Sequence, residues 1–168
     1  AYLSCLTACL DKILLKTKSL HERGMSKEIL TVANHCDGVY VYLKLKKEGN
    51  PRADEVLELL GWNGGGTNST GVGIACVDFL GNVHPDQFWM HYTLGNVRDR
   101  KFSQIWTDTN ETLLWKLRNR VAYLKGRCAG CKWLKICGGG FRARAELMTG
   151  DPFASDPMCY LTEEEIHA

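Results

Sequence analysis

Four cysteines late in this 168-residue chain have the spacing of metal ligands. Cys128, Cys131, Cys137 and Cys159 form the pattern C-x2-C-x5-C-x21-C. A C-x2-C turn directs two thiolates at one metal centre, and the two later cysteines bring the set to four. The spacing therefore predicts an all-thiolate metal site on these four residues.

Zinc and an iron-sulfur cluster both suit four thiolates. Zinc ribbons usually supply their ligands as two C-x2-C pairs, and the later half of this pattern has no such pair. Iron-sulfur ligation accepts uneven spacing more readily. Gly138, Gly139 and Gly140 follow the third cysteine, so their N–H groups could reach cluster sulfurs without hindrance from side chains. We therefore favour an iron-sulfur cluster and keep a structural zinc as the alternative.

The net charge of +2 conceals a basic stretch around the cysteines. Residues 112–145 contain no acid, and their basic side chains are Lys116, Arg118, Arg120, Lys125, Arg127, Lys132, Lys135, Arg142 and Arg144. Positive charge there would offset the negative charge of a thiolate-ligated cluster. The stretch contains no recognisable nucleic-acid reading motif, so we expect no nucleic-acid partner.

The other four cysteines are less informative. Cys5 and Cys9 lie four residues apart on a predicted helix, where we expect them to pack in the core as small apolar side chains. Cys36 and Cys76 are isolated in the sequence. Packing is the default expectation for both, and contact with the cluster or a substrate is the alternative.

The first twenty residues lack the basic and then apolar pattern of a secretory leader, because Asp11, Lys12, Lys16 and Lys18 interrupt them. The sequence also lacks an apolar run long enough to span a membrane. We expect a soluble cytoplasmic protein without a membrane partner. In that reducing compartment, clustered cysteines bind metal more often than they form disulfides.

Apolar periodicity and turn residues predict an α+β fold to position these cysteines. Helices are predicted at residues 3–23, 39–47 and 53–60, with a short strand at 28–33. The glycine-rich residues 64–69 mark a boundary near residue 70. A β-hairpin follows, from residues 72–79 through a turn at 80–82 to a strand from Val83, and then helices at 103–120 and 141–148. Thr162 and Glu165 form a capping-box pattern for a terminal helix.

From Gly71 onward, the order of motifs resembles the C-terminal SPASM-type region of radical SAM enzymes. The motifs are Leu80-Gly81-Asn82-Val83-His84-Pro85-Asp86, Leu94-Gly95-Asn96-Val97-Arg98, Phe102, Ile105-Trp106 and the four cysteines. Residues 129–137 (Ala-Gly-Cys-Lys-Trp-Leu-Lys-Ile-Cys), 149–151 and 156–162 are similar to the NirJ/AhbC type, from haem d1 and siroheme-dependent haem biosynthesis. The resemblance implies a C-terminal fragment of a partial (β/α) barrel at residues 1–70. It implies a SPASM-like domain, with a β-hairpin, helices and a cluster-binding loop, at 71–168.

The resemblance also implies one auxiliary 4Fe-4S cluster on Cys128, Cys131, Cys137 and Cys159. The family reaction removes carboxylate side chains from a siroheme-derived tetrapyrrole, and the auxiliary cluster would relay an electron or position this substrate. We expect an electron donor protein as a further partner. The family's C-x3-C-x2-C loop, which binds S-adenosylmethionine and a second 4Fe-4S cluster, does not occur in this sequence. We expect that loop in an N-terminal radical SAM half or a split subunit, and we expect this chain to be inactive alone.

Asp86 stands where family members with two auxiliary clusters have a cysteine, so we expect no second auxiliary cluster. His84 and His91 lie on either side of Asp86. We expect both to be ordinary surface or hydrogen-bonded groups rather than metal ligands. The spacing of the side chains identifies no catalytic acid or base.

Two other functions stay open on the sequence alone. One is a zinc-stabilised binding module that uses the basic stretch as its partner surface. The other is a stand-alone iron-sulfur electron carrier, which would cycle reversibly without any partner that binds S-adenosylmethionine.

Overall fold

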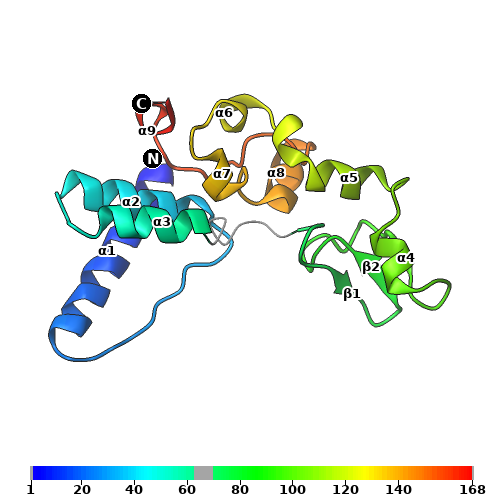
Figure 1. Cartoon of the computed structure of the whole chain (residues 1–168), viewed down its shortest axis with the longest axis horizontal. Coiled ribbons are helices and arrows are strands. Elements are labelled where there is room, and N and C mark those ends of the chain that lie inside the picture. The colour runs from blue at the N-terminus through cyan, green and yellow to red at the C-terminus, as the bar shows by residue number, and fades with distance from the viewer. Residues whose placement is uncertain (1, 63–69, 168) are drawn as a thin grey trace.

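The structure is a computed structural model that describes residues 2–62 and 70–167, with side chains from Cys5 onward. Three helices form one end of the molecule (Figure 1). They are α1 (Tyr2–Glu22), α2 (Cys36–Lys47) and α3 (Ala53–Trp62), and all three were predicted. Asp11 of α1 accepts a hydrogen bond from Tyr40 of α2 (3.0 Å) and pairs with Lys44 (3.1 Å). These polar contacts hold α1 against α2.

Residues 28–33 do not form the predicted strand. They run between α1 and α2 as an extended segment, in which Ile29, Leu30 and Val32 are exposed. A strand needs a neighbour for its N–H and C=O groups, and no strand of the described residues pairs with this segment. The predicted helix-strand-helix order is therefore wrong in its middle element, because an apolar composition alone does not supply a pairing partner.

A small antiparallel sheet lies at the opposite end of the molecule (Figure 1). Its strands are β1 (Cys76–Val77), β2 (Asn82–His84) and β3 (Gly95–Asn96), with β2 in the middle. Asp78 fixes the turn between β1 and β2 by accepting the N–H groups of Leu80 (2.9 Å) and Asn82 (2.8 Å). The predicted hairpin is confirmed with shorter strands, and its assignment to the SPASM type stays a prediction.

The single helix predicted at residues 103–120 is two helices. They are α4 (Phe102–Trp106) and α5 (Thr112–Arg118). The polar residues 107–111 interrupt the helical pattern, and Glu111 begins α5 by accepting the N–H of Leu113 (3.2 Å). Ile105 and Leu114 are fully buried in a core cluster with Val83, so both helices pack on the sheet end.

The cysteine-bearing segment begins between the two ends and finishes beside the N-terminal helices (Figure 1). It contains a 3-10 helix (Arg120–Ala122), α6 (Gly126–Ala129), α7 (Leu134–Cys137), α8 (Arg142–Thr149) and α9 (Glu163–His167). As predicted, α8 ends at Gly150, whose φ is 77°. The predicted capping box is also confirmed, because the Thr162 N–H bonds Glu165 (2.7 Å) and the Glu165 N–H bonds Thr162 (3.2 Å).

The cysteine-bearing segment and the three N-terminal helices share one hydrophobic core. Its buried residues are Leu10, Cys36, Val39, Tyr42 and Ala53 from the N-terminal helices, and Trp133, Ile136, Tyr160, Leu161 and Ile166 from the later segment. The glycine-rich boundary predicted at residues 64–69 lies outside the described residues. None of the described helices is long and apolar enough to cross a membrane.

Candidate metal centre

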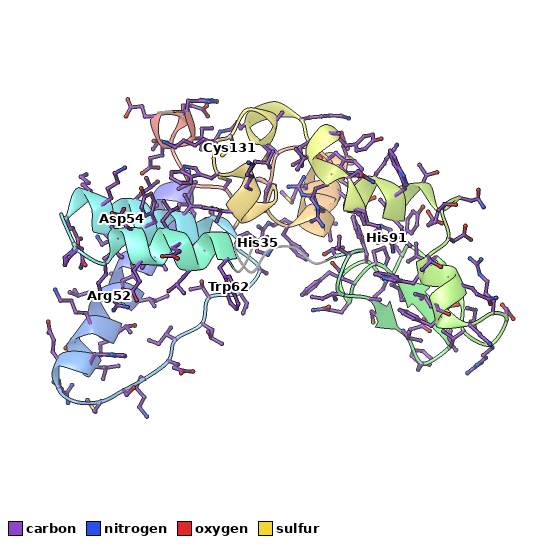
Figure 2. The ribbon with its side chains drawn as sticks, viewed as in Figure 1. His35, Arg52, Asp54, Trp62, His91 and Cys131 are labelled. Carbon is purple, nitrogen blue, oxygen red and sulfur yellow. The ribbon has the colours of Figure 1, made fainter. Side chains whose placement is uncertain are left out.

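The four predicted ligands line one cavity. Cys128 lies in α6, Cys131 follows α6, Cys137 is the last residue of α7, and Cys159 precedes α9. The cavity holds about 490 Å³ of atom-free space, part of it open to solvent. Figure 2 shows Cys131 near the middle of the molecule, above α7. Packing thus gathers the four thiols around one narrow hollow.

At three of the four cysteines, the backbone N–H two residues further along the chain acts to lower the pKa of the thiol. The pairs are Cys131 with Trp133, Cys137 with Gly139, and Cys159 with Leu161. An N–H donor stabilises the thiolate and so lowers the pKa of the thiol. The Cys128 thiol instead points at the carbonyl oxygen of Gly139 (3.8 Å).

The three glycines after Cys137 all have left-handed backbone angles, with φ of 59°, 86° and 77°. The Gly138 N–H bonds the Leu134 carbonyl (2.8 Å) and the Gly140 N–H bonds the Cys137 carbonyl (3.0 Å), whereas the Gly139 N–H acts to lower the pKa of the Cys137 thiol. The expectation that these amides face cluster sulfurs stays a prediction for Gly139. The amides of Gly138 and Gly140 close turns. The presence of three consecutive glycines in the sequence does not by itself predict these turns.

Burial works against thiolates at two of the four cysteines. It raises the pKa of Cys137 to about 12, and it also raises the pKa of Cys131. A bound metal reverses this preference, because a coordinating thiol is deprotonated by the positive charge of the metal. Without a metal, Cys131 and Cys137 therefore favour the neutral thiol, and a bound metal would favour the thiolate at both.

Two arginines bring positive charge to the cavity. Arg127 lines it and donates to the Cys159 carbonyl (3.2 Å), the Leu161 carbonyl and Glu163 (2.5 Å). Arg142 is fully buried behind the glycines, and it donates to the carbonyls of Gly139, Gly140, Pro152 and Ala154. These bonds hold the glycine turn in place with cationic groups, which would offset the negative charge of a thiolate-ligated cluster.

A buried ion pair joins the glycine turn to the N-terminal region. Asp156 pairs with Arg144 (2.5 Å) and accepts the N–H groups of Phe141 (2.7 Å) and Met158 (3.0 Å). Burial alone would raise the pKa of Asp156, but the Arg144 and amide hydrogen bonds outweigh it and leave the pKa lowered. Arg144 also donates to the carbonyl of Ala33 (2.8 Å). The chain ahead of α2 is thereby tied to the cavity wall.

A fifth thiol, Cys36, lines the same cavity. It is the first residue of α2, is 4% exposed, and its sulfur lies 3.6 Å from the Asn34 side-chain oxygen and 3.9 Å from the Met158 carbonyl oxygen. The neighbouring Cys159 and burial raise the pKa of the Cys36 thiol. No motif marks this residue in the sequence, and the packing of α2 on the later segment places it here.

The other three cysteines do not line the cavity. Cys5 and Cys9 are exposed on α1, so the expectation that they pack in the core is wrong. The buried contacts of α1 come instead from Leu10, with Leu6 and Leu14 partly buried beside it. Cys76 lies half-buried in β1.

His84 and His91 are ordinary hydrogen-bonded side chains, as expected. His84 is buried, with Nδ1 2.9 Å from the Tyr92 carbonyl, while the exposed His91 faces Glu146 (3.1 Å). Asp86 between them accepts hydrogen bonds from Thr70 and from the Phe88 N–H. Figure 2 shows His91 toward the sheet end, away from Cys131. The three residues therefore form no common ligand set.

Much of the basic stretch is bonded within the molecule. Arg118 donates to the Gly71 and Trp106 carbonyls, Arg120 donates to the Leu117 and Thr70 carbonyls, and Lys125 pairs with Asp151. Lys116 and Lys132 lie over the rings of Tyr123 and Trp133. These contacts, with those of Arg127, Arg142 and Arg144, give most of the stretch a structural role.

The arrangement of the thiols bears on which metal group could bind in the cavity. Among the described residues, no three Cys, His, Asp or Glu side chains converge closely enough to hold one metal ion. Zinc binds sulfur at about 2.3 Å, which requires four sulfurs around a single point. A four-iron cluster is larger, and each sulfur binds a different iron. The four thiols that line one cavity are a donor set for a metal group with several thiolate ligands, and the choice of an iron-sulfur cluster over zinc stays a prediction.

Comparison with curated proteins relates this chain to enzymes of haem biosynthesis. It is 56% identical over 93% of its length to Fe-coproporphyrin III synthase of Methanosarcina barkeri. It is 43% identical over 88% of its length to pre-heme d1 synthase of Dinoroseobacter shibae. AdoMet-dependent heme synthase of Nitratidesulfovibrio vulgaris is 35% identical over 53% of the chain. These relatives confirm the resemblance to radical SAM haem-biosynthesis enzymes of the NirJ/AhbC type.

The chain covers only part of each relative. It spans 39% of the first, 36% of the second and 23% of the third. No family model matches the chain, and no solved structure matches it. The partial barrel and the SPASM-like domain therefore stay predictions.

Proposed function

We propose that this chain is the auxiliary-cluster portion of a radical SAM haem-biosynthesis enzyme and lies in the C-terminal part of that enzyme. Cys128, Cys131, Cys137 and Cys159 would bind one 4Fe-4S cluster. The complete enzyme would remove carboxylate side chains from a siroheme-derived tetrapyrrole. The observation that carries the proposal is the convergence of these four thiols on one cavity, in a chain related to enzymes named for haem-type products.

The residues around the cavity have separate roles in this proposal. The four cysteines supply thiolates, and the amides of Trp133, Gly139 and Leu161 stabilise the charge on three of them. Arg127 and Arg142 offset the remaining negative charge. The side chains of Leu134, Leu161 and Ile166 line the cavity and limit the access of water. An iron-sulfur cluster supplies one-electron transfer when it is bound.

The rest of the proposed enzyme supplies what this chain lacks. S-adenosylmethionine and a second 4Fe-4S cluster would bind the portion that carries a C-x3-C-x2-C loop, in the same polypeptide or in a split subunit. An electron donor protein would supply reducing equivalents. The tetrapyrrole is proposed as the substrate because two relatives are named for Fe-coproporphyrin III and pre-heme d1.

Anaerobic reconstitution with iron and sulfide tests the cluster directly. We expect a brown protein with about four iron and four sulfide per chain, and an electron paramagnetic resonance signal after reduction. Cys131→Ser should lose the cluster, because it removes a ligand from the cavity. Cys5→Ser is the matched control, since Cys5 is exposed and outside the cavity. A chain that takes up only zinc, or a Cys131→Ser variant that keeps four iron, would contradict the proposal.

A further inference from the structure

We propose that a hollow between α5 and α8 binds one edge of the tetrapyrrole substrate, where Lys116 pairs with a carboxylate side chain and aromatic side chains contact the flat ring. This inference rests on the proposed function, because that proposal supplies the tetrapyrrole. It assigns a substrate-binding role to residues outside the four-cysteine motif and outside the cavity of the metal centre.

The hollow has an aromatic floor. It holds about 780 Å³ of atom-free space, part of it open to solvent. The rings of Tyr92, Tyr123 and Phe153 line it, and those of Tyr123 and Phe153 lie 5.7 Å apart between their centres. Ligand sites are concave and mostly apolar, with a few polar groups that fix the ligand. Aromatic faces stack on flat conjugated rings, so this floor suits a tetrapyrrole.

Lys116 of α5 brings a positive charge to the hollow. Its ammonium group lies 5.6 Å from the centre of the Tyr123 ring, and it forms no ion pair with an acid of the described residues. The other lysine of the hollow, Lys125, is paired with Asp151 (2.5 Å). Lys116 is therefore the cation of the hollow that is available to a substrate carboxylate.

The acidic groups nearby are occupied by internal donors. Glu146 of α8 accepts a hydrogen bond from the indole N–H of Trp89 and lies 3.1 Å from Nε2 of His91. Glu111, just before α5, accepts the hydroxyl of Tyr92 (2.9 Å). These bonds reduce the repulsion that the two carboxylates would exert on a negatively charged ligand.

The hollow shares a wall with the candidate metal centre. Lys125 lines the hollow, and its carbonyl accepts a hydrogen bond from the hydroxyl of Ser155 (3.1 Å), which lines the metal cavity. The Lys125 N–H in turn donates to the carbonyl of Phe153 (2.9 Å). A tetrapyrrole bound in the hollow would therefore lie beside the cluster that is proposed to relay an electron or position it.

Binding of coproporphyrin III without iron tests the role of Lys116. The iron-free compound is the probe because iron could bind exposed thiols directly. We would titrate it into reconstituted wild type, Lys116→Met, Lys116→Arg and Lys12→Met, and follow the anisotropy of porphyrin fluorescence. Lys116→Met keeps the length of the side chain but removes its charge, so it should raise the Kd about three- to tenfold. Lys116→Arg should stay near wild type. Lys12→Met is the matched control, since Lys12 is exposed on α1, far from α5 (Figure 1).

The tetramethyl ester of coproporphyrin III separates the carboxylates from the ring. It keeps the ring but has no negative charge, so Lys116→Met should leave its affinity unchanged. Tyr123→Leu should weaken binding of the acid and of the ester alike, by about two- to tenfold, and Tyr123→Phe should restore both. If Tyr123→Leu does not fold, the Lys116 variants still decide the question.

The outcomes separate this inference from the proposed function. Wild-type affinity in Lys116→Met, or an equal loss in Lys12→Met, would overturn the inference. So would a wild-type chain that assembles the cluster and binds no coproporphyrin III. A chain that assembles no cluster would instead refute the proposed function, because iron content is measured separately from porphyrin binding.

Discussion

Gly140 and Gly150 provide a matched test of how tightly the cavity wall is built. Both glycines have a φ of +77°, so any other residue suffers the same backbone strain at either position. A Cβ on Gly150 would meet nothing within 4 Å, whereas a Cβ on Gly140 would lie 2.3 Å from a carboxylate oxygen of Asp156. Gly150→Ala therefore isolates backbone strain, and Gly140→Ala adds displacement of a buried carboxylate.

The two substitutions should differ clearly in stability. A left-handed conformation costs an L-residue about 1–2 kcal/mol, which is the full effect expected for Gly150→Ala. Displaced Asp156 would weaken its bonds to Arg144 and to the N–H groups of Phe141 and Met158. Hydrogen bonds to charged groups contribute about 1.5–3 kcal/mol, so loss of one brings Gly140→Ala to about 2.5–5 kcal/mol.

Urea unfolding followed by tryptophan fluorescence measures the difference, since Trp89 and Trp133 are buried. At a slope of about 2 kcal/mol per M, the midpoint should fall by about 0.5–1 M for Gly150→Ala and about 1.3–2.5 M for Gly140→Ala. Equal losses in the two variants would refute the reasoning. They would mean that Asp156 moves aside freely and that its buried bonds do not hold the wall.

Three further predictions concern charge and hydrogen bonding. The lowered pKa of Asp156 contributes stability that is present above the usual carboxyl pKa of about 3.9 and is lost as the pH falls through the lower folded value. The urea midpoints of wild type and Asp156→Asn should therefore converge at acid pH, and a constant gap would contradict the ion pair. The chain should show only weak salt dependence on a polyanion column, because much of its basic stretch is bonded internally; steep dependence would instead favour the binding-module hypothesis. Trp133→Phe should lose about 1–2 kcal/mol of unfolding free energy, because its indole N–H donates to the Glu165 carbonyl (2.7 Å), and an unchanged midpoint would show that this bond adds no stability.

Patterns of neighbouring residues predicted those helices and helix ends that depend on interactions between residues close in the sequence. Apolar spacing predicted α1, a glycine predicted the end of α8, and the Thr162 and Glu165 pair predicted the start of α9. Each of these signals acts within a few residues of the structure it sets. The strand predicted at 28–33 needed a partner elsewhere in the chain, so its composition was not sufficient.

The residues of the candidate site also fall into two groups, those that motif spacing predicted and those that long-range packing places there. The motif spacing predicted which four cysteines gather, because short turns bring three of them together. Cys36 reaches the cavity only through the packing of α2, and the bond from Arg144 to Ala33 also joins distant segments. Neither contact has a signal in the neighbouring sequence. Exposure of Cys5 and Cys9 likewise depends on which face of α1 is covered.

The fold should survive a cut of the chain in the extended segment between α1 and α2. Arg23, Lys27 and the apolar residues after them are exposed, so a protease such as trypsin has ready access to this stretch. Helix α1 is held independently by Leu10 in the core and by Asp11 on α2. A molecule cut after Lys27 would therefore migrate as a single particle in native buffer and resolve into two fragments only in denaturant.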